Sequence, residues 1–150
     1  MRIVLQRVSV ASVKIKGEVK GQIGLGFVAF LGIADDDQED DLDWIVKKVT
    51  QLRVFSDAES KMNLSIQDVE GNILLISQFT LLASTKKGNR PSFIRAASPE
   101  KAVPLYELAI EKFSSAIGKD VKTGEFGADM KIQLINDGPV TIIIDSKIRE

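Results

Sequence analysis

A short polar stretch, Ser77-Gln78-Phe79-Thr80, interrupts a segment that is otherwise apolar enough for a protein core. Buried hydroxyl and amide groups need hydrogen-bond partners, so either the chain surfaces here or these side chains line a pocket. Thr80 could be a nucleophile if a base took its proton, or a structural threonine with a hydrogen-bonded hydroxyl. Residue chemistry alone leaves both interpretations of Thr80 open.

The 150-residue chain contains no cysteine and no histidine, which restricts the chemistry available to it. Disulfides, zinc sites built from Cys or His, and Cys-His or Ser-His-Asp relays are excluded. Acid–base catalysis would have to come from carboxylates, lysines, the single tyrosine Tyr106, the backbone or the substrate. We expect no metal and no other cofactor.

Basic residues follow the polar stretch closely. Lys86, Lys87, Arg90 and Arg95 alternate with Gly, Asn, Ser and one Phe, and residues 71–98 contain no acid. Such residues can bind phosphates and stack on bases, as in loops that recognise single-stranded RNA. A plain solvated loop can have the same composition, so RNA binding and ordinary surface both remain possible here.

The acids are concentrated elsewhere, with seven of them and no base in residues 34–43. Apolar residues at helical spacing follow from Leu42 to Leu52, so these acids lie near the N-terminal end of an expected helix, where the dipole favours them. They lack the Asp-x-Asp-x-Asp-Gly pattern of a calcium loop. A structural role is therefore favoured over a metal site.

A second unusual segment is Asn136-Asp137-Gly138-Pro139, which lies between two apolar runs. Asn, Asp and Gly suit turns, so the segment is typical of a tight connection. A Gly-Pro bond can also be cis at modest cost, which would fix the direction of the neighbouring carbonyl groups.

The elements that position these segments are those of an α/β (α+β) protein with a mixed, largely antiparallel sheet and two main helices, forming one domain over residues 1–150. The second helix is expected to begin at Ser98-Pro99, with Ser98 as cap, and to end at Gly118. Strands are expected within 3–33 (with a hairpin at Lys16-Gly17 and a central strand over 23–33), 73–82, 131–135 and 140–145, the last two joined by residues 136–139.

The first ten residues lack the long apolar stretch of a signal peptide. The longest early uncharged run, residues 23–34, is shorter than the roughly 20 residues needed to span a bilayer. We therefore expect a cytoplasmic protein without membrane contact.

The polar stretch and the Asn136-Asp137-Gly138-Pro139-Val140-Thr141 segment together resemble the paired signature of the D-aminoacyl-tRNA deacylases, also called D-tyrosyl-tRNA deacylases. The resemblance covers essentially the whole chain. Further matching segments are Met1–Val8, Gly26–Gly32, Lys61-Met62-Asn63, Gly88–Phe93 and Thr123–Met130.

The resemblance implies a homodimeric hydrolase that cleaves the ester between a D-amino acid and the 3′-terminal adenosine of tRNA. It also implies action on glycyl-tRNA mischarged on tRNA(Ala). Gly138-Pro139 would be cis and would act in the partner's active site, where its carbonyl groups capture the substrate amino group and leave no room for an L side chain. Arg7 would brace this turn, and Phe126 and Met130 would lie near the pocket.

The catalytic centre implied by the resemblance is formed by Ser77, Gln78, Phe79 and Thr80. Backbone N–H groups around Phe79 and Thr80 would stabilise the oxyanion, with Gln78 assisting and the substrate's ribose hydroxyl helping to position or activate water. The basic residues of the loop would contact the tRNA. The alternatives are a non-catalytic RNA-binding or editing-like module and an esterase with Thr80 as nucleophile.

Overall fold

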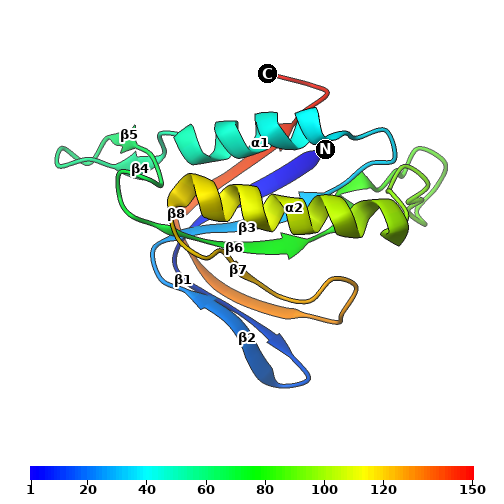
Figure 1. The fold of residues 1–150 in the computed structure, drawn as a ribbon, viewed down its shortest axis with the longest axis horizontal. Helices are drawn as coiled ribbons and strands as arrows, with labels where there is room; N and C mark the ends of the chain where they lie inside the picture. Colours follow the sequence, from blue (N-terminus) through cyan, green and yellow to red (C-terminus); the bar gives the residue numbers. More distant parts are fainter.

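The long strand β1 organises the sheet of this protein, whose computed structural model describes all residues 1–150 (Figure 1). β1 pairs antiparallel with β3 through its first half, with β2 through its second half, and with β8 along almost all of its length. β6 joins β3 in parallel, and β7 joins β6. The strands are β1 (Arg2–Ile15), β2 (Glu18–Ile23), β3 (Gly26–Gly32), β6 (Asn72–Ser77), β7 (Lys122–Thr123) and β8 (Lys131–Asp145).

Two helices, α1 (Glu39–Gln51) and α2 (Pro99–Ile117), cover one face of this sheet (Figure 1). Their apolar stripes pack against the sheet in the larger of two apolar clusters, where Ile45 and Phe113 are fully buried. The mixed α+β fold with a largely antiparallel sheet and two main helices confirms the fold class expected from the sequence.

β3 is apolar without interruption because both of its faces are buried. Phe27 and Leu31 face the helices, whereas Val28 belongs to a second cluster on the other face. The predicted strand over residues 23–33 was too long at its start, since Ile23 belongs to β2 and Gly24-Leu25 separate the two strands.

The predicted strand over residues 73–82 is wrong in its second half. β6 ends at Ser77, and residues Phe79–Leu82 form a short 3₁₀ helix, η1. The N–H of Gln78 still donates to Leu31 of β3 (2.8 Å), but the carbonyl of Gln78 accepts the N–H of Leu81 instead of continuing the sheet. The polar stretch therefore marks the point where the chain leaves the sheet.

The last two predicted strands are one continuous strand. β8 pairs with β1 on both sides of residues 136–139, and the register shifts opposite Arg7. The segment is an irregularity within a strand, so the expected tight connection between two separate strands is wrong. Turn-forming residues are equally compatible with a bulge, and only pairing with β1 distinguishes the two.

The remaining elements include one pair of strands that the sequence did not reveal, β4 (Phe55–Ser56) and β5 (Met62–Leu64). Ser98 stands at the start of α2 as expected, although its side chain makes no capping hydrogen bond, and Gly118 ends the helix in the left-handed conformation (φ 69°). No helix is long and apolar enough to cross a membrane.

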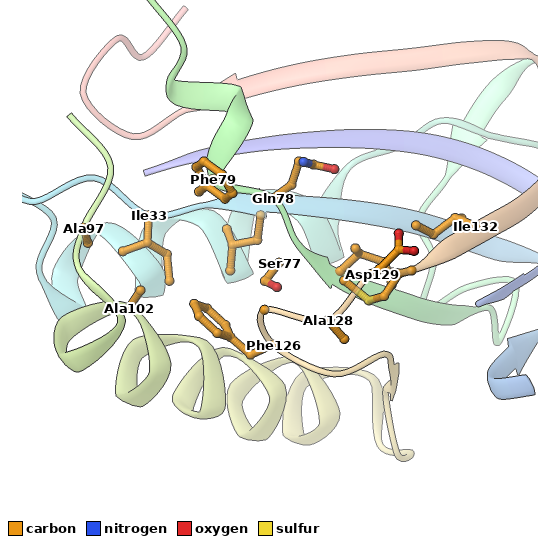
Figure 2. A pocket seen from close by; sticks show the side chains of 14 residues that line it. Ile33, Ser77, Gln78, Phe79, Ala97, Ala102, Phe126, Ala128, Asp129 and Ile132 are labelled. Carbon is orange, nitrogen blue, oxygen red and sulfur yellow. The ribbon is translucent and has the colours of Figure 1, made fainter. Parts of the chain in front are cut away.

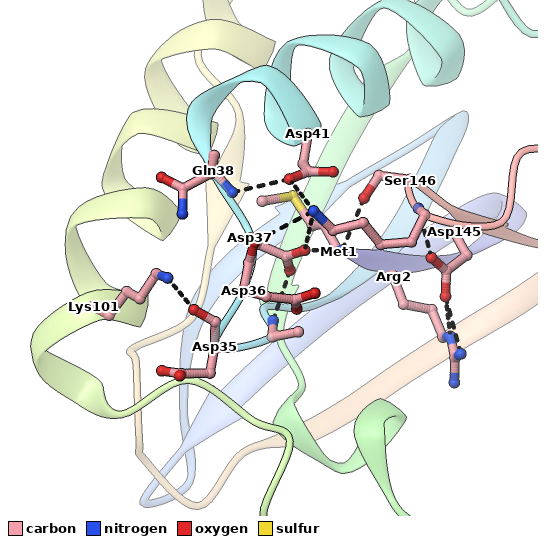
Figure 3. A network of polar contacts seen from close by, with 12 residues as sticks. Met1, Arg2, Asp35, Asp36, Asp37, Gln38, Asp41, Lys101, Asp145 and Ser146 are labelled. Carbon is pink, nitrogen blue, oxygen red and sulfur yellow. Dashed lines mark hydrogen bonds and ion pairs between the residues drawn. The ribbon is translucent and has the colours of Figure 1, made fainter.

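The acidic run is a structural feature, as its position suggested (Figure 3). Asp41 accepts the N–H of Gln38 (2.9 Å) at the start of α1, and Asp37 accepts the N–H of Ala34 (2.7 Å). The buried Asp37 also pairs with the N-terminal ammonium of Met1. These contacts fix the start of α1 against the beginning of β1.

Asp41 makes the stability of this region depend on pH. Its burial raises the pKa, but hydrogen bonds from Lys147, the Gln38 N–H and Ser146 outweigh this effect and lower the pKa from 3.8 to about 2. A carboxylate whose pKa is depressed by folding stabilises the protein above its unfolded pKa, and this contribution is lost as the pH falls from about 4 towards 2.

We predict that Asp41→Asn lowers the free energy of unfolding at pH 7 by about 2 kcal/mol, as a shift of this size implies. The difference from wild type should shrink as the pH falls below 4. Urea unfolding at several pH values measures it, with the exposed Asp40→Asn as matched control. A difference that is the same at pH 7 and pH 3 would contradict the role of the ionised Asp41.

Candidate active site

A cavity of about 250 Å³ lies where β3 and β6 end, and the polar stretch forms part of its wall (Figure 2). Ser77 and Gln78 border it at the end of β6, and Ala102 of α2 borders it from the helix layer. The segment from Phe126 to Met130 closes the remaining side. Most of the wall is apolar, so a bound group would lie between hydrophobic side chains and a few polar groups at the end of β6.

Backbone N–H groups are available at the mouth of this cavity. Phe79 and Thr80 are the first residues of η1, and the first N–H groups of a helix have no carbonyl partner within it. Phe79 is 56% exposed although it is aromatic, and its ring meets that of Phe93 edge-on at 5.1 Å. An oxyanion placed at this helix start would therefore meet backbone donors beside an aromatic edge.

The four residues of the predicted catalytic stretch do not all line the cavity. Ser77, Gln78 and Phe79 do, whereas Thr80 borders a separate surface groove together with Arg2 and Leu81. The Thr80 hydroxyl accepts a hydrogen bond from the Gln78 side-chain amide. No Lys, Asp or Glu side chain is hydrogen-bonded to Thr80, so nothing there is placed to take its proton.

The predicted pocket residues Phe126 and Met130 both line the cavity. Phe126 packs against Tyr106, whose hydroxyl donates to the carbonyl of Leu75 (2.8 Å). Burial raises the pKa of Tyr106 to about 12, so this tyrosine stays protonated and is not an acid–base catalyst near neutral pH.

Several residues of the wall were not singled out in the sequence because only the fold brings them there. Leu31, Ile33 and Ala102 are core-type residues by their pattern. Asp129 is the one carboxylate on the wall, and it pairs with Lys131 at 2.7 Å. Asp129 is exposed and its charge is balanced by Lys131, so the wall holds no unpaired carboxylate that is placed as a general base.

The side chain of Arg7 is hydrogen-bonded to the segment that contains Gly138 and Pro139. Its buried guanidinium donates to the carbonyl of Asp137 (2.7 Å) and to the carbonyl of Val54 (2.5 Å). The bond between Gly138 and Pro139 is cis, and both residues are exposed.

Asn136 provides a second brace that the sequence did not reveal. Its side chain accepts the N–H of Val140 (2.7 Å) and donates to Thr141 Oγ1 (3.1 Å), so it spans the irregularity in β8. The sequence identifies residues 136–141 as a motif. Only the structure shows that the Asn136 side chain connects the two ends of this segment by hydrogen bonds.

The cavity and the Gly138-Pro139 segment do not meet within one chain. Arg7 lies opposite Phe27 at the start of β3, whereas the cavity is bordered by Leu31 and Ile33 at its end. At about 3.3 Å per residue, Phe27 and Leu31 are roughly 13 Å apart along the strand. The exposed segment therefore lies apart from the cavity of its own chain, whose wall does not include Gly138 or Pro139.

The basic loop, residues 83–97 between η1 and α2, lies beside the cavity. Phe93, which contacts Phe79, comes from this loop, and the loop is closed by paired hydrogen bonds between Ser84 and Ser92 (2.8 and 2.9 Å). The four predicted RNA-contact residues are exposed and pair with no carboxylate: Lys86, Lys87, Arg90 and Arg95. Their charge is thus free to attract an anion near the opening.

Comparison with known proteins gives consistent matches over the whole chain. The family model described as D-Tyr-tRNA(Tyr) deacylase matches residues 4–145. Proteins named D-aminoacyl-tRNA deacylase from Bacteroides fragilis (strain YCH46) and Akkermansia muciniphila are 59% and 55% identical, with all of both chains covered in each case.

Solved structures share the fold. The c-Myc DNA unwinding element binding protein superposes with a TM-score of 0.91 at 39% identity, covering 97% of this chain and 98% of that one. A probable eukaryotic D-amino acid tRNA deacylase superposes with a TM-score of 0.84 at 17% identity, covering 96% and 98%.

We predict that Arg7→Lys lowers the free energy of unfolding by about 1–3 kcal/mol, because a lysine cannot donate to both buried carbonyl groups. In Arg7→Lys, hydrogen exchange at the amides of Asp137, Gly138 and Val140 should be faster than in the wild type. Arg90→Lys, at an exposed arginine without a bonded partner, is the matched control. Unchanged exchange in Arg7→Lys would show that the guanidinium does not hold this segment.

Proposed function

This chain belongs to the D-Tyr-tRNA deacylase family, and from that premise we propose how its own residues hydrolyse the ester of a D-aminoacyl-tRNA. It is an ester hydrolase of the D-aminoacyl-tRNA deacylase kind. Water adds to the ester carbonyl, the bond to the terminal ribose oxygen breaks, and the products are a free D-amino acid and a tRNA with a free 3′-terminal hydroxyl. The observation that carries the proposed mechanism is the cavity with free backbone N–H groups and no general base.

In this mechanism the aminoacyl group enters the cavity and its carbonyl oxygen lies against the N–H groups of Phe79 and Thr80. These donors stabilise the negative charge that develops when water attacks, and the Gln78 amide assists. Asp129 is paired with a lysine and Tyr106 is held protonated, so neither is the base. The substrate's ribose hydroxyl then positions or activates the water.

The chiral gate is proposed to come from a second copy of the chain. The braced, exposed Gly138-Pro139 segment cannot reach its own cavity, and a homodimer would deliver it to the partner's cavity instead. Its carbonyl groups would hold the substrate amino group and exclude an L side chain. A rigid backbone wall reads the configuration at the α-carbon whatever the side chain, so several D-amino acids and glycine would be accepted.

The 3′ end of the tRNA is proposed to be bound by the basic loop. Lys86, Lys87, Arg90 and Arg95 are unpaired and exposed, and the loop reaches the opening of the cavity through Phe93. Phosphate contacts of this kind position a nucleic acid without reading its sequence.

The function is tested with D-tyrosyl-tRNA and L-tyrosyl-tRNA as parallel substrates, and with glycyl-tRNA(Ala) as a third. We expect release of D-tyrosine and glycine and negligible release of L-tyrosine. Equal hydrolysis of both tyrosine enantiomers would contradict the proposed gate. If no substrate is hydrolysed, the protein is not a deacylase and the alternative of an RNA-binding module is favoured.

We predict that Thr80→Ala retains most of its kcat, because the Thr80 hydroxyl lies outside the cavity and bonds only Gln78. The exposed Thr85→Ala is the matched control. Loss of an obligatory nucleophile costs a factor of about 10⁴ or more. A loss of that size in Thr80→Ala alone would establish the nucleophilic threonine and overturn the substrate-assisted route.

We also predict that Gly138→Ala lowers kcat/KM for D-tyrosyl-tRNA by about tenfold or more, since loss of an oriented contact to the reacting group has effects of this order. The φ of Gly138 is 154°, and an added Cβ would lie 2.7 Å from the backbone nitrogen of Val140, so the segment must shift. The control is Gly24→Ala, where φ is not positive and the nearest atom, the carbonyl oxygen of Ser9, lies 3.9 Å from the added Cβ. Wild-type activity and selectivity in Gly138→Ala would contradict the gate.

A further inference from the structure

A second basic surface lies at the opposite end of the molecule from the basic loop. We call it the helix-end surface. It consists of Lys47 and Lys48 in the last turns of α1 and Arg53 in the segment that follows the helix. Residues 44–56 contain no acid, although the first turn of the same helix is acidic. The dipole of a helix favours basic residues at its C-terminal end, which explains Lys47 and Lys48. It does not explain Arg53, which lies beyond the helix.

No side chain of the helix-end surface forms an ion pair within the protein. Its three side chains are exposed, and no carboxylate lies within 4.0 Å of any of them. By contrast, Lys112 neutralises the acidic start of the helix, where it pairs with Glu39 at 2.8 Å and with Asp43. The unpaired cations are therefore confined to one end of α1.

This surface is shaped as well as charged. A shallow depression of about 390 Å³ is lined by Trp44, Lys47, Lys48, Gln51, Leu52 and Arg53. The Lys48 ammonium lies 5.6 Å from the centre of the half-buried Trp44 ring, and the Arg53 guanidinium is oriented by a bond to the carbonyl of Asn63 (2.8 Å). Several separate basic side chains around an open depression are better suited to the phosphate backbone of a nucleic acid than to a single small anion.

The helix-end surface is rigidly connected to the Gly138-Pro139 segment. Arg53 directly precedes Val54, and the carbonyl of Val54 is bonded to the same Arg7 guanidinium that holds Asp137. In Figure 1 the end of α1 and the β4–β5 pair lie at one side of the molecule, and the loop that follows η1 lies at the other. A dimer that delivers this segment to the partner's cavity therefore also brings the helix-end surface towards that cavity.

We propose that the helix-end surface of one copy binds the phosphate backbone of the tRNA whose aminoacylated end occupies the cavity of the other copy. This inference rests on the proposed function. The tRNA is then held at two places, by the basic loop of the subunit that hydrolyses its ester and by the helix-end surface of the subunit that supplies the gate.

The test compares the triple variant Lys47→Gln/Lys48→Gln/Arg53→Gln with Lys14→Gln/Lys20→Gln/Lys122→Gln, a control that removes the same charge from exposed lysines of β1, β2 and β7. Each variant and the wild type are assayed on D-tyrosyl-tRNA and on D-tyrosyl-adenosine. Binding of uncharged tRNA is measured by fluorescence anisotropy over a range of salt concentrations.

We expect the helix-end variant to weaken tRNA binding and raise KM for D-tyrosyl-tRNA by about tenfold, and to reduce the slope of log K against log salt by about 2 to 3, as loss of three phosphate contacts implies. Hydrolysis of D-tyrosyl-adenosine should be unchanged. If tRNA binding, its salt slope and KM match those of the control variant, the surface does not bind tRNA and the inference is overturned. A wild type that binds tRNA but hydrolyses neither ester would instead refute the proposed function, while the binding curves would still decide the role of the surface.

Discussion

The buried guanidinium of Arg7 is the contact on which the arrangement of this molecule depends. It stands on the central strand and joins two segments that are far apart in the chain, the connection after α1 through Val54 and the irregularity of β8 through Asp137. Two carbonyl groups that β-pairing leaves free are satisfied by one side chain, and burial makes each of these hydrogen bonds costly to lose. The exposed Gly138-Pro139 segment is thereby fixed relative to both the sheet and the helix layer.

A fixed segment at one end and an open cavity at the other together explain how so small a protein could be selective without a strong base. The start of η1 provides N–H groups, the ends of β3 and β6 with α2 provide apolar walls, and the proposed second copy provides carbonyl groups. None of these groups changes protonation during the reaction. The proposed recognition is therefore by backbone groups, and the RNA substrate contributes part of the chemistry.

Much of this could be predicted from the sequence, and the failures have identifiable physical causes. The motifs around Gln78 and Gly138, the acidic helix start and the double-sided burial of β3 all follow from local pattern. The end of β6 at Ser77 was missed because Phe79, Leu81 and Leu82 are as apolar as strand residues. The continuity of β8 was missed because its pairing with β1 is a tertiary property. Leu31 and Ala102 line the cavity, but in the sequence they have the same apolar pattern as ordinary core residues.

A mixed-dimer assay shows whether one site is built by two copies of the chain. One chain carries Ala128→Phe, which fills the cavity but keeps the gate, and the other carries Gly138→Ala, which keeps the cavity but displaces the gate. Alone on D-tyrosyl-tRNA, each variant should have at most about a tenth of the wild-type activity. Co-expressed in equal amounts, they should recover up to about a quarter of the wild-type activity, because half of the dimers are mixed and each mixed dimer has one intact site. If the mixed preparation is no more active than the two variants measured separately, the cavity and the gate do not act across subunits.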